Sequence, residues 1–259
     1  MSEPTVVTLA DPEACSEAAA ERIVEILDVA IDANGEAHWV TTGGSSAAGI
    51  YQHLATSELR SAIDWRRVQL WWTDERLVPS DHALSNAKLA DDILLTHPAG
   101  EVAGLPIPID NVHPIPTAGA IAGGHGADWA AARYVEELQA DGPETNDDGW
   151  PAFDLILLGV GPDGHIMSVF PGSEAFDDPA WVVGVPAPTH VEPHVPRVTL
   201  NPAIAAAAHE LLVVSHGASK AAILRDVLRG ERDERRLPAQ LARHPGATWI
   251  LDRAAAANL

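Results

Sequence analysis

Residues 153–171 of the chain are FDLILLGVGPDGHIMSVFP, an apolar run followed directly by a glycine-rich segment. The run Phe153–Leu158 predicts a buried strand of a parallel sheet, because both faces of such a strand are covered. The three glycines that follow let the backbone turn tightly and approach a ligand closely. Asp163 and His165 lie together at the mouth of this turn. In α/β proteins this is where ligands bind, so the segment predicts an α/β fold with a functional loop after the strand.

A histidine with a carboxylate two residues away can be tuned as a proton acceptor near neutral pH. His165 is therefore a candidate general base, and Asp163 is its neighbour in the same loop. The alternative is a glycine-rich connection whose histidine has no catalytic role. The loop taken alone does not separate these two interpretations.

The same loop matches the dinucleotide-binding pattern G-x-G-x-x-G through Gly159, Gly161 and Gly164. That pattern requires a helix that begins at once, whereas Pro171 and Gly172 interrupt any helix within about two turns. It also normally follows the first strand of a domain, and here it lies past mid-chain. We therefore expect no nicotinamide or flavin cofactor.

The composition limits the class of protein. A length of 259 residues suits one large α/β domain or two small ones, and no apolar run is long enough to span a bilayer. The start, Met1–Pro4, lacks the basic and apolar regions of a secretory signal. The single cysteine, Cys15, cannot form an internal disulfide and has no basic residue near it in sequence. These features favour a cytoplasmic protein.

The formal net charge of −21 argues against nucleic acid and anionic membranes as partners, since both require a basic face. It also repels anionic substrates, so a phosphorylated ligand needs cations placed locally. The chain has only two lysines, Lys88 and Lys220, which makes each a candidate.

Hydrophobic periodicity predicts alternating strands and helices along the chain. This order indicates a doubly wound, largely parallel sheet with helices on both faces, in a Rossmann-like single domain over residues 1–259. The acidic link 141–150 is interpreted as a surface excursion within that domain rather than as a boundary. The expected helices are 12–33, 47–54, 85–95, 127–140 and 217–230, the expected strands 38–42, 68–72, 153–158, 210–215 and 248–251, and the expected loops 97–126 and 179–196.

Polar clusters follow several predicted strands, and the carboxyl ends of parallel strands converge on one crevice. Gly43–Ser46 precedes a helix and suits an anion, although a simple helix cap is the alternative. Lys220 lies at the start of a predicted helix, where the helix dipole disfavours a cation. This cost favours a functional role for Lys220. Arg197 is either a further cation of the site or a solvated arginine on a proline-rich loop. Asp74–Arg76 is either part of the site or a charged strand end.

His190 and His194 are four residues apart, as metal ligands on a helix often are. Prolines between and around them exclude a helix that would align the two rings, so we expect no metal site there.

Taken together, these motifs resemble the 6-phosphogluconolactonases, which share a superfamily with the glucosamine-6-phosphate deaminases. The resemblance covers residues from about 38 to 250 in the family's order. The matching segments are Thr42–Ser45, Trp72–Arg76 with Ser85-Asn86, Gly159–His165 with Phe170–Gly172, Pro196–Thr199 and Gly217–Lys220. The resemblance implies a cofactor-free hydrolase of the oxidative pentose phosphate pathway. Its reaction would open 6-phospho-D-glucono-1,5-lactone to 6-phospho-D-gluconate.

The resemblance also implies roles for individual residues. His165 matches the family's proposed general base, Asp163 its neighbour, and Asp74 the acidic residue of the second strand. The phosphate contacts match the glycine–serine loop, Arg197 and Lys220, and Arg76 matches an arginine near the substrate. The full set of candidate site residues is His165, Asp163, Asp74, Gly43, Gly44, Ser45, Ser46, Arg76, Arg197 and Lys220. Ile166-Met167 departs from the smaller or more polar residues of many members and leaves the local pocket shape open.

Two alternative functions remain: a sugar-phosphate deaminase or isomerase, and a non-catalytic sugar-phosphate-binding sensor. Deaminases of the superfamily carry a glutamate that assists ring opening where this chain has Phe170. A sensor would lack the base and usually carries a nucleic-acid-binding module. The expected partner is a small sugar-phosphate lactone, with neither nucleic acid nor membrane, and the chain is expected to be a monomer or a homodimer.

Overall fold

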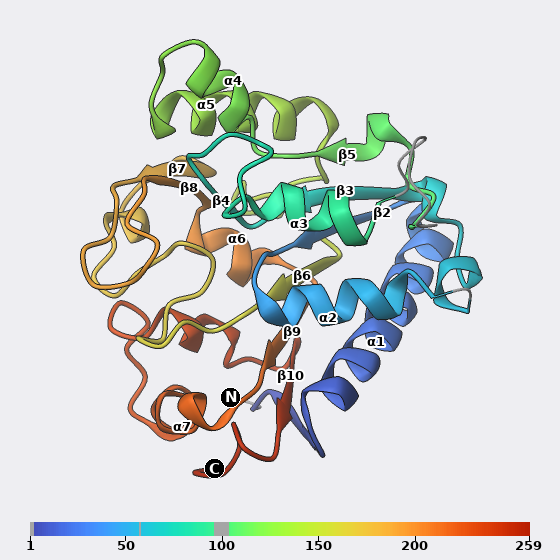
Figure 1. The fold of residues 1–259 in the computed structure, drawn as a ribbon, viewed down its shortest axis with the longest axis vertical. Helices are drawn as coiled ribbons and strands as arrows, with labels where there is room; N and C mark the ends of the chain where they lie inside the picture. The colour runs from blue at the N-terminus through green and yellow to red at the C-terminus, as the bar shows by residue number, and fades with distance from the viewer. Residues whose placement is uncertain (1–2, 57, 96–103) are drawn as a thin grey trace.

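The computed structural model describes residues 3–56, 58–95 and 104–259, which form two sheets with helices packed around them (Figure 1). The larger sheet has the order β1-β10-β9-β6-β2-β3-β5, and every neighbouring pair in it is parallel. Its strands are β1 Thr5–Leu9, β2 Ala37–Thr41, β3 Val68–Trp72, β5 Val112–His113, β6 Leu155–Leu158, β9 Glu210–Ser215 and β10 Ala247–Asp252. This confirms the α/β class and the parallel, doubly wound sheet.

The helices cover both faces of the large sheet. In Figure 1, α1 and α2 lie on one side of it, and α6 and α7 lie on the other. The helices are α1 Pro12–Asn34, α2 Ser45–Leu54, α3 Asn86–Ile93, α4 Thr117–Ala122, α5 Ala127–Asp141, α6 Pro202–Ala207 and α7 Ala221–Arg229. Among the described residues, none of these helices has both the length and the apolar character needed to cross a bilayer.

The strand order reverses between β2 and β6. From β2 the chain adds β3 and β5 on one side, whereas β6, β9 and β10 extend the sheet on the other side. The loops after β2 and β6 therefore leave the sheet side by side and in different directions. Such a switch point opens a crevice at the carboxyl ends of the strands, which is where open α/β sheets bind ligands.

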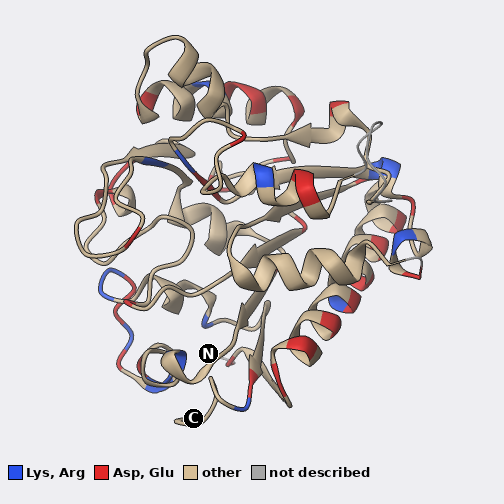
Figure 2. Cartoon of the chain, in the orientation of Figure 1, with Lys and Arg blue, Asp and Glu red and all other residues tan. Residues whose placement is uncertain are grey.

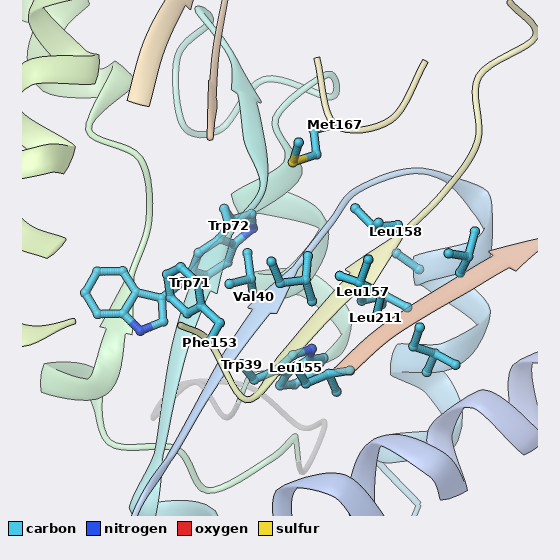
Figure 3. Packing of buried hydrophobic residues seen from close by; sticks show 14 of the residues in the cluster. Trp39, Val40, Trp71, Trp72, Phe153, Leu155, Leu157, Leu158, Met167 and Leu211 are labelled. Atoms are coloured by element: carbon cyan, nitrogen blue, oxygen red, sulfur yellow. The ribbon is translucent and has the colours of Figure 1, made fainter. Parts of the chain in front are cut away.

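The centre of the sheet is held by large buried side chains. Trp39 of β2, Trp71 and Trp72 of β3, and Phe153 and Leu155 around β6 pack together, each at most 1% exposed (Figure 3). Aromatic side chains of this size contribute much of the apolar area that a core removes from water. Trp72, the last residue of β3, is thereby fixed in the core two residues before Asp74.

The second sheet was not expected from the sequence. It is antiparallel, in the order β4-β8-β7, and consists of β4 Asp74–Arg76, β8 Arg197–Leu200 and β7 Val182–Val185. Asp74 pairs with Thr199, and Arg76 pairs with Arg197. Segments more than a hundred residues apart in sequence thus meet at one edge of the crevice.

Several other predictions about local structure need correction. The expected loop 97–126 contains β5, α4 and a 3-10 turn, Ile109–Asn111, and its part 97–103 lies outside the described residues. The proline-rich segment 179–196 contains β7, and β1 and α6 were missed altogether. The expected helix 217–230 begins as a 3-10 turn, Ala218–Lys220, before α7. These elements are short, so they have too few residues for a periodic pattern to develop.

Candidate active site

A pocket of about 300 Å³ lies at the carboxyl ends of β2, β6 and β9 and is closed on one side by β4 and β8. All the candidate residues except Asp163 line it, so segments that are distant in sequence converge as expected. The candidates on its wall are Gly43, Gly44, Ser45, Ser46, Asp74, Arg76, His165, Arg197 and Lys220. Asp163 lies directly behind His165 and contacts its ring.

Asp163 is held between two histidines. Its Oδ1 lies 2.5 Å from Nδ1 of His165, and its Oδ2 lies 3.0 Å from Nε2 of His190. The backbone N–H of His165 also donates to Oδ1, at 3.2 Å. Burial by itself raises the pKa of this carboxyl, but the hydrogen bonds from His165 and His190 outweigh burial and lower the pKa of Asp163 below its usual range. Asp163 is therefore ionised and accepts hydrogen bonds from both rings.

The ionised Asp163 also fixes the tautomer of His165. A carboxylate can only accept, so Nδ1 carries the proton, and in the neutral ring the lone pair is on Nε2. The His165 side chain is 13% exposed, and the residue lines the pocket. Nε2 has no hydrogen-bond partner among the described residues, which leaves it available to a substrate or a water molecule.

The glycines after β6 form the tight turn that the sequence predicts. Gly161 lies against the imidazole of His165, where a β-carbon would overlap the ring. Its N–H donates to the carbonyl oxygen of His165 at 2.8 Å and closes the turn. Gly164 has a φ of 85°, a left-handed conformation that favours glycine. Between this turn and Gly172 the described residues form no helix, as Pro171 and Gly172 predict.

The loop after β2 presents backbone donors to the pocket. Gly44 precedes α2 with a φ of 92°, and no side chain caps the first turn of this helix. Gly43 packs against the amide of Asn86, and a β-carbon there would overlap that side chain. The first amides of α2, at Ser45 and Ser46, thus have no side-chain cap and lie at the pocket wall, which suits an anion.

Three cations line the pocket without a carboxylate partner: among the described residues, Arg76, Arg197 and Lys220 form no ion pair. They donate to carbonyl oxygens instead, and Arg197 also donates to the Ser168 hydroxyl at 3.5 Å. Arg76 donates to Leu84 at 2.7 Å, Arg197 to Pro193 at 3.1 Å and Lys220 to Val160 at 2.6 Å. The other lysine, Lys88, pairs with Asp92 at 2.6 Å.

Burial lowers the pKa of Lys220, and Asp163 opposes this effect. Burial likewise lowers the pKa of Arg197, while Asp74 raises it. Both groups have thus lost solvation that an anion in the pocket would replace. Figure 2 shows the acidic residues distributed along outer elements such as α1 and α5, whereas the pocket collects these cations.

The carboxylates beside these cations accept hydrogen bonds from neutral donors. Asp74 is 4% exposed and accepts from the hydroxyls of Ser168 and Thr73. Glu75 is 1% exposed and binds the start of α3, accepting from the Ser85 hydroxyl and from the backbone N–H groups of Asn86 and Ala87. Burial raises the pKa of Glu75, and these donors oppose it.

Sequence reasoning missed several residues at this site. His190 was considered only as a metal ligand, and Ser168 was not considered at all. Asn86 was recognised as a helix cap and as part of a motif, yet it also lies on the pocket wall. Met167, Val191 and Glu192 complete the wall near the proline-rich segment. The expectation that Arg197 could be a solvated loop residue is wrong, because Arg197 lies in β8 and is 2% exposed.

Phe170 packs between the loop that carries His165 and the second sheet. Its ring centroid is 4.7 Å from that of His165 and 5.1 Å from the guanidinium carbon of Arg197. His190 contacts the ring edge-on at 5.6 Å. The position therefore holds a buried apolar ring against two residues of the pocket wall, His165 and Arg197. Among the described residues, no group of three or more His, Cys, Asp and Glu side chains is arranged to hold a metal ion.

Comparison with known proteins places this geometry in a family. The sequence pattern of the glucosamine-6-phosphate isomerases/6-phosphogluconolactonases matches residues 10–251, nearly the whole chain. This chain belongs to that family. Among its members, a 6-phosphogluconolactonase of Streptomyces coelicolor is 36% identical over 262 residues, which cover 99% of this chain and 95% of the relative.

Other members of the family agree. A 6-phosphogluconolactonase of Mycobacterium tuberculosis is 36% identical over 244 residues, which cover 93% of each chain. The solved structure of 6-phosphogluconolactonase from Trypanosoma cruzi superimposes with a TM-score of 0.84 at 29% identity, covering 99% of this chain and 97% of that one. The largely parallel sheet is thus the fold of the glucosamine-6-phosphate isomerase/6-phosphogluconolactonase family.

Proposed function

We propose that this protein hydrolyses 6-phospho-D-glucono-1,5-lactone to 6-phospho-D-gluconate, a step of the oxidative pentose phosphate pathway in the cytoplasm. One observation carries the proposal: the His165–Asp163 pair and the unpaired cations Arg76, Arg197 and Lys220 meet in one pocket. The pair suits proton transfer at a carbonyl, and the cations suit a phosphate group on the same molecule. The related 6-phosphogluconolactonases of similar length support this choice of substrate.

His165 acts as the general base. Its Nε2 lone pair takes a proton from water as the water oxygen bonds to the lactone carbonyl carbon, giving a tetrahedral oxyanion. When this intermediate collapses, the bond from that carbon to the ring oxygen breaks. The imidazolium then returns its proton to the ring oxygen, so the cycle ends with neutral histidine and an open-chain acid. A positioned base of this kind contributes typically about 10²–10⁴-fold to the rate.

Asp163 makes this cycle possible by orienting the ring and stabilising the imidazolium. It accepts from Nδ1 throughout, so the lone pair stays on Nε2 and the positive charge of the intermediate state has a carboxylate beside it. Because His190 occupies the other oxygen, Asp163 cannot rotate away from His165 without losing a second hydrogen bond.

The phosphate lies between the start of α2 and the pocket cations. Backbone N–H groups of the Gly43–Ser46 loop and the side chains of Arg197 and Lys220 supply charge-assisted donors. Asp74 accepts from hydroxyl groups of the sugar. Arg76, or backbone N–H groups of the glycine loops, stabilises the oxyanion.

The experiment is a lactone-consumption assay with purified protein, corrected for spontaneous hydrolysis. We expect enzyme-dependent loss of 6-phosphogluconolactone with equimolar formation of acid, and much slower loss of unphosphorylated gluconolactone. If the protein leaves the spontaneous rate unchanged, or releases ammonia from glucosamine-6-phosphate instead, the proposal is wrong.

A further inference from the structure

Ser168 lies in a tight turn whose backbone conformation is unusual. Met167, the residue before it, has a φ of 54°, a left-handed conformation that is rare for a residue with a long side chain. The N–H of Val169 donates to the carbonyl oxygen of Ile166 at 2.9 Å and closes the turn. Non-glycine residues keep such a conformation only where surrounding contacts require it, and they concentrate at functional sites. The turn directs the Ser168 side chain toward the second sheet.

The Ser168 hydroxyl is fully buried between two residues that line the pocket. Its O–H donates to Oδ2 of Asp74 at 2.6 Å, and Nη1 of Arg197 donates to Oγ of Ser168 at 3.5 Å. Within the described part of the chain, this hydroxyl is the only hydrogen-bond partner of Oδ2. Thr73 and Asn86 bind the other carboxylate oxygen, Oδ1.

Asp74 and Arg197 form no ion pair, although they lie on adjacent strands of a buried sheet. A buried carboxylate near a buried guanidinium would ordinarily pair with it, because each has lost its water. Here the hydroxyl of Ser168 stands between them and satisfies the oxygen of Asp74 that faces Arg197. The guanidinium therefore keeps its charge unpaired in the pocket.

We propose that Ser168 is a positioning residue that determines specificity, because it prevents Asp74 from capturing Arg197. This inference rests on the proposed function, in which Arg197 binds the phosphate of the substrate. Removing the hydroxyl leaves Oδ2 of Asp74 buried without a donor, a state that proteins avoid. Arg197 is the donor at hand, so its guanidinium turns to Asp74 and is lost to the phosphate.

The primary test is Ser168→Ala, assayed on 6-phosphogluconolactone and on unphosphorylated gluconolactone. We expect kcat/KM for the phosphorylated lactone to fall about tenfold, mostly through KM, as for the loss of one charge-assisted contact. The unphosphorylated lactone should change less than about twofold, because the His165–Asp163 pair is untouched. Loss of the fold would slow both lactones alike, so the ratio separates the two causes.

Thr41→Val is the matched control. Thr41 is also fully buried, and its hydroxyl shares a hydrogen bond with the Tyr51 hydroxyl at 2.7 Å. The variant removes a buried hydroxyl that contacts neither Ser168 nor Asp74 nor Arg197, and it should leave the ratio of the two lactones unchanged. If Ser168→Ala folds poorly, Ser168→Cys fills the space with a much weaker donor and should shift the ratio in the same direction.

A double-mutant cycle with Asp74→Asn tests the route of the effect. An asparagine has no negative charge with which to hold the guanidinium, so adding Ser168→Ala to Asp74→Asn should cost the phosphorylated substrate little further. The inference is wrong if the two changes multiply, or if Ser168→Ala slows both lactones equally. If the wild-type protein does not prefer the phosphorylated lactone at all, it is the proposed function that fails.

Discussion

Gly161 and His165 lie so close together that a single methyl group on the glycine would occupy the space of the imidazole ring. The two residues also share a hydrogen bond, from the Gly161 N–H to the His165 carbonyl oxygen at 2.8 Å. The absent side chain of one residue therefore sets the position of the other. This contact links a feature visible in the sequence, the spacing of the glycines, to the position of the candidate base.

Gly161→Ala should reduce turnover nearly as much as losing the base. The added β-carbon displaces the His165 ring from Asp163, and a base that is out of position forfeits most of its contribution of about 10²–10⁴-fold. The measurement is kcat on 6-phosphogluconolactone, with the denaturation midpoint taken in parallel. Gly126→Ala is the control, because Gly126 does not line the pocket and a β-carbon there has no other part of the protein within 4 Å. Equal losses in the two variants would contradict the prediction.

His165→Ala should abolish most activity while leaving the fold and substrate binding nearly intact. His165 acts on the transition state, whereas the phosphate is held elsewhere in the pocket, so KM should change little. Steady-state kinetics and equilibrium binding of 6-phosphogluconate test this. A variant that keeps more than about a tenth of wild-type turnover, against the 10²–10⁴-fold expected of a base, removes His165 from that role.

Lys220→Ala and Arg197→Ala should each lose discrimination between phosphorylated and unphosphorylated lactone. Charge-assisted hydrogen bonds contribute about 1.5–3 kcal/mol each, so kcat/KM for the phosphorylated substrate should fall about tenfold to a hundredfold. Lys88→Ala, which removes the other lysine and its exposed pair with Asp92, is the control and should have no effect on either lactone. If all three variants behave alike, the cluster is not a phosphate site.

Glucosamine-6-phosphate should yield no ammonia with this protein. Ring opening in the resembling deaminases involves a glutamate, and the corresponding position here holds Phe170, whose ring packs against His165 and Arg197. Phe170→Glu alone should not create the activity, because the surrounding groups are not arranged for that proton transfer. A coupled assay for ammonia on both proteins decides the matter, and enzyme-dependent release by the wild type would reverse the assignment.

Asp163 should make stability depend on pH in one direction. Its pKa in the folded protein is lowered, so its contribution is fully present above the unfolded value of about 3.9 and declines as the pH falls toward the folded value. The stability advantage of wild type over Asp163→Asn should therefore be larger at about pH 6 than at about pH 3. Urea unfolding at both pH values measures it. Asp148→Asn, at an exposed carboxylate in a surface turn, controls for the general loss of charge.

The main elements of the fold could be predicted because their signals are local. Apolar runs in the sequence predicted β2, β3, β6, β9 and β10, and helical periodicity predicted α1 and α5. The sheet of β4, β8 and β7 gave no such signal. Its strands have four residues or fewer, and it pairs Asp74 with Thr199, more than a hundred residues away in the sequence. Long-range antiparallel pairing of short strands depends on tertiary packing, which a single sequence does not display.

Those residues of the candidate site that directly follow an apolar strand could be predicted from the sequence. Glycines, serines and charged residues after apolar runs placed the candidates at the correct end of the sheet. His190 and Ser168 escaped because each acts through another residue, Asp163 and Asp74 respectively. A residue that supports a functional group has no distinctive neighbours in sequence, since its role is defined by a contact across the fold.

The pairing of β4 with β8 has a consequence for how the protein is made. During synthesis, the glycine–serine loop, Asp74 and Arg76 leave the ribosome long before their counterparts Arg197 and Lys220 exist. At the centre of the sheet, β2 cannot pair with β6 until that strand, more than a hundred residues later in the sequence, has been made. Contacts of such separation close slowly, because the entropy of the intervening chain must be overcome first. The candidate site of a nascent chain therefore stays incomplete until Lys220, residue 220 of 259, has been translated, and the strands made earlier are exposed to aggregation throughout that interval.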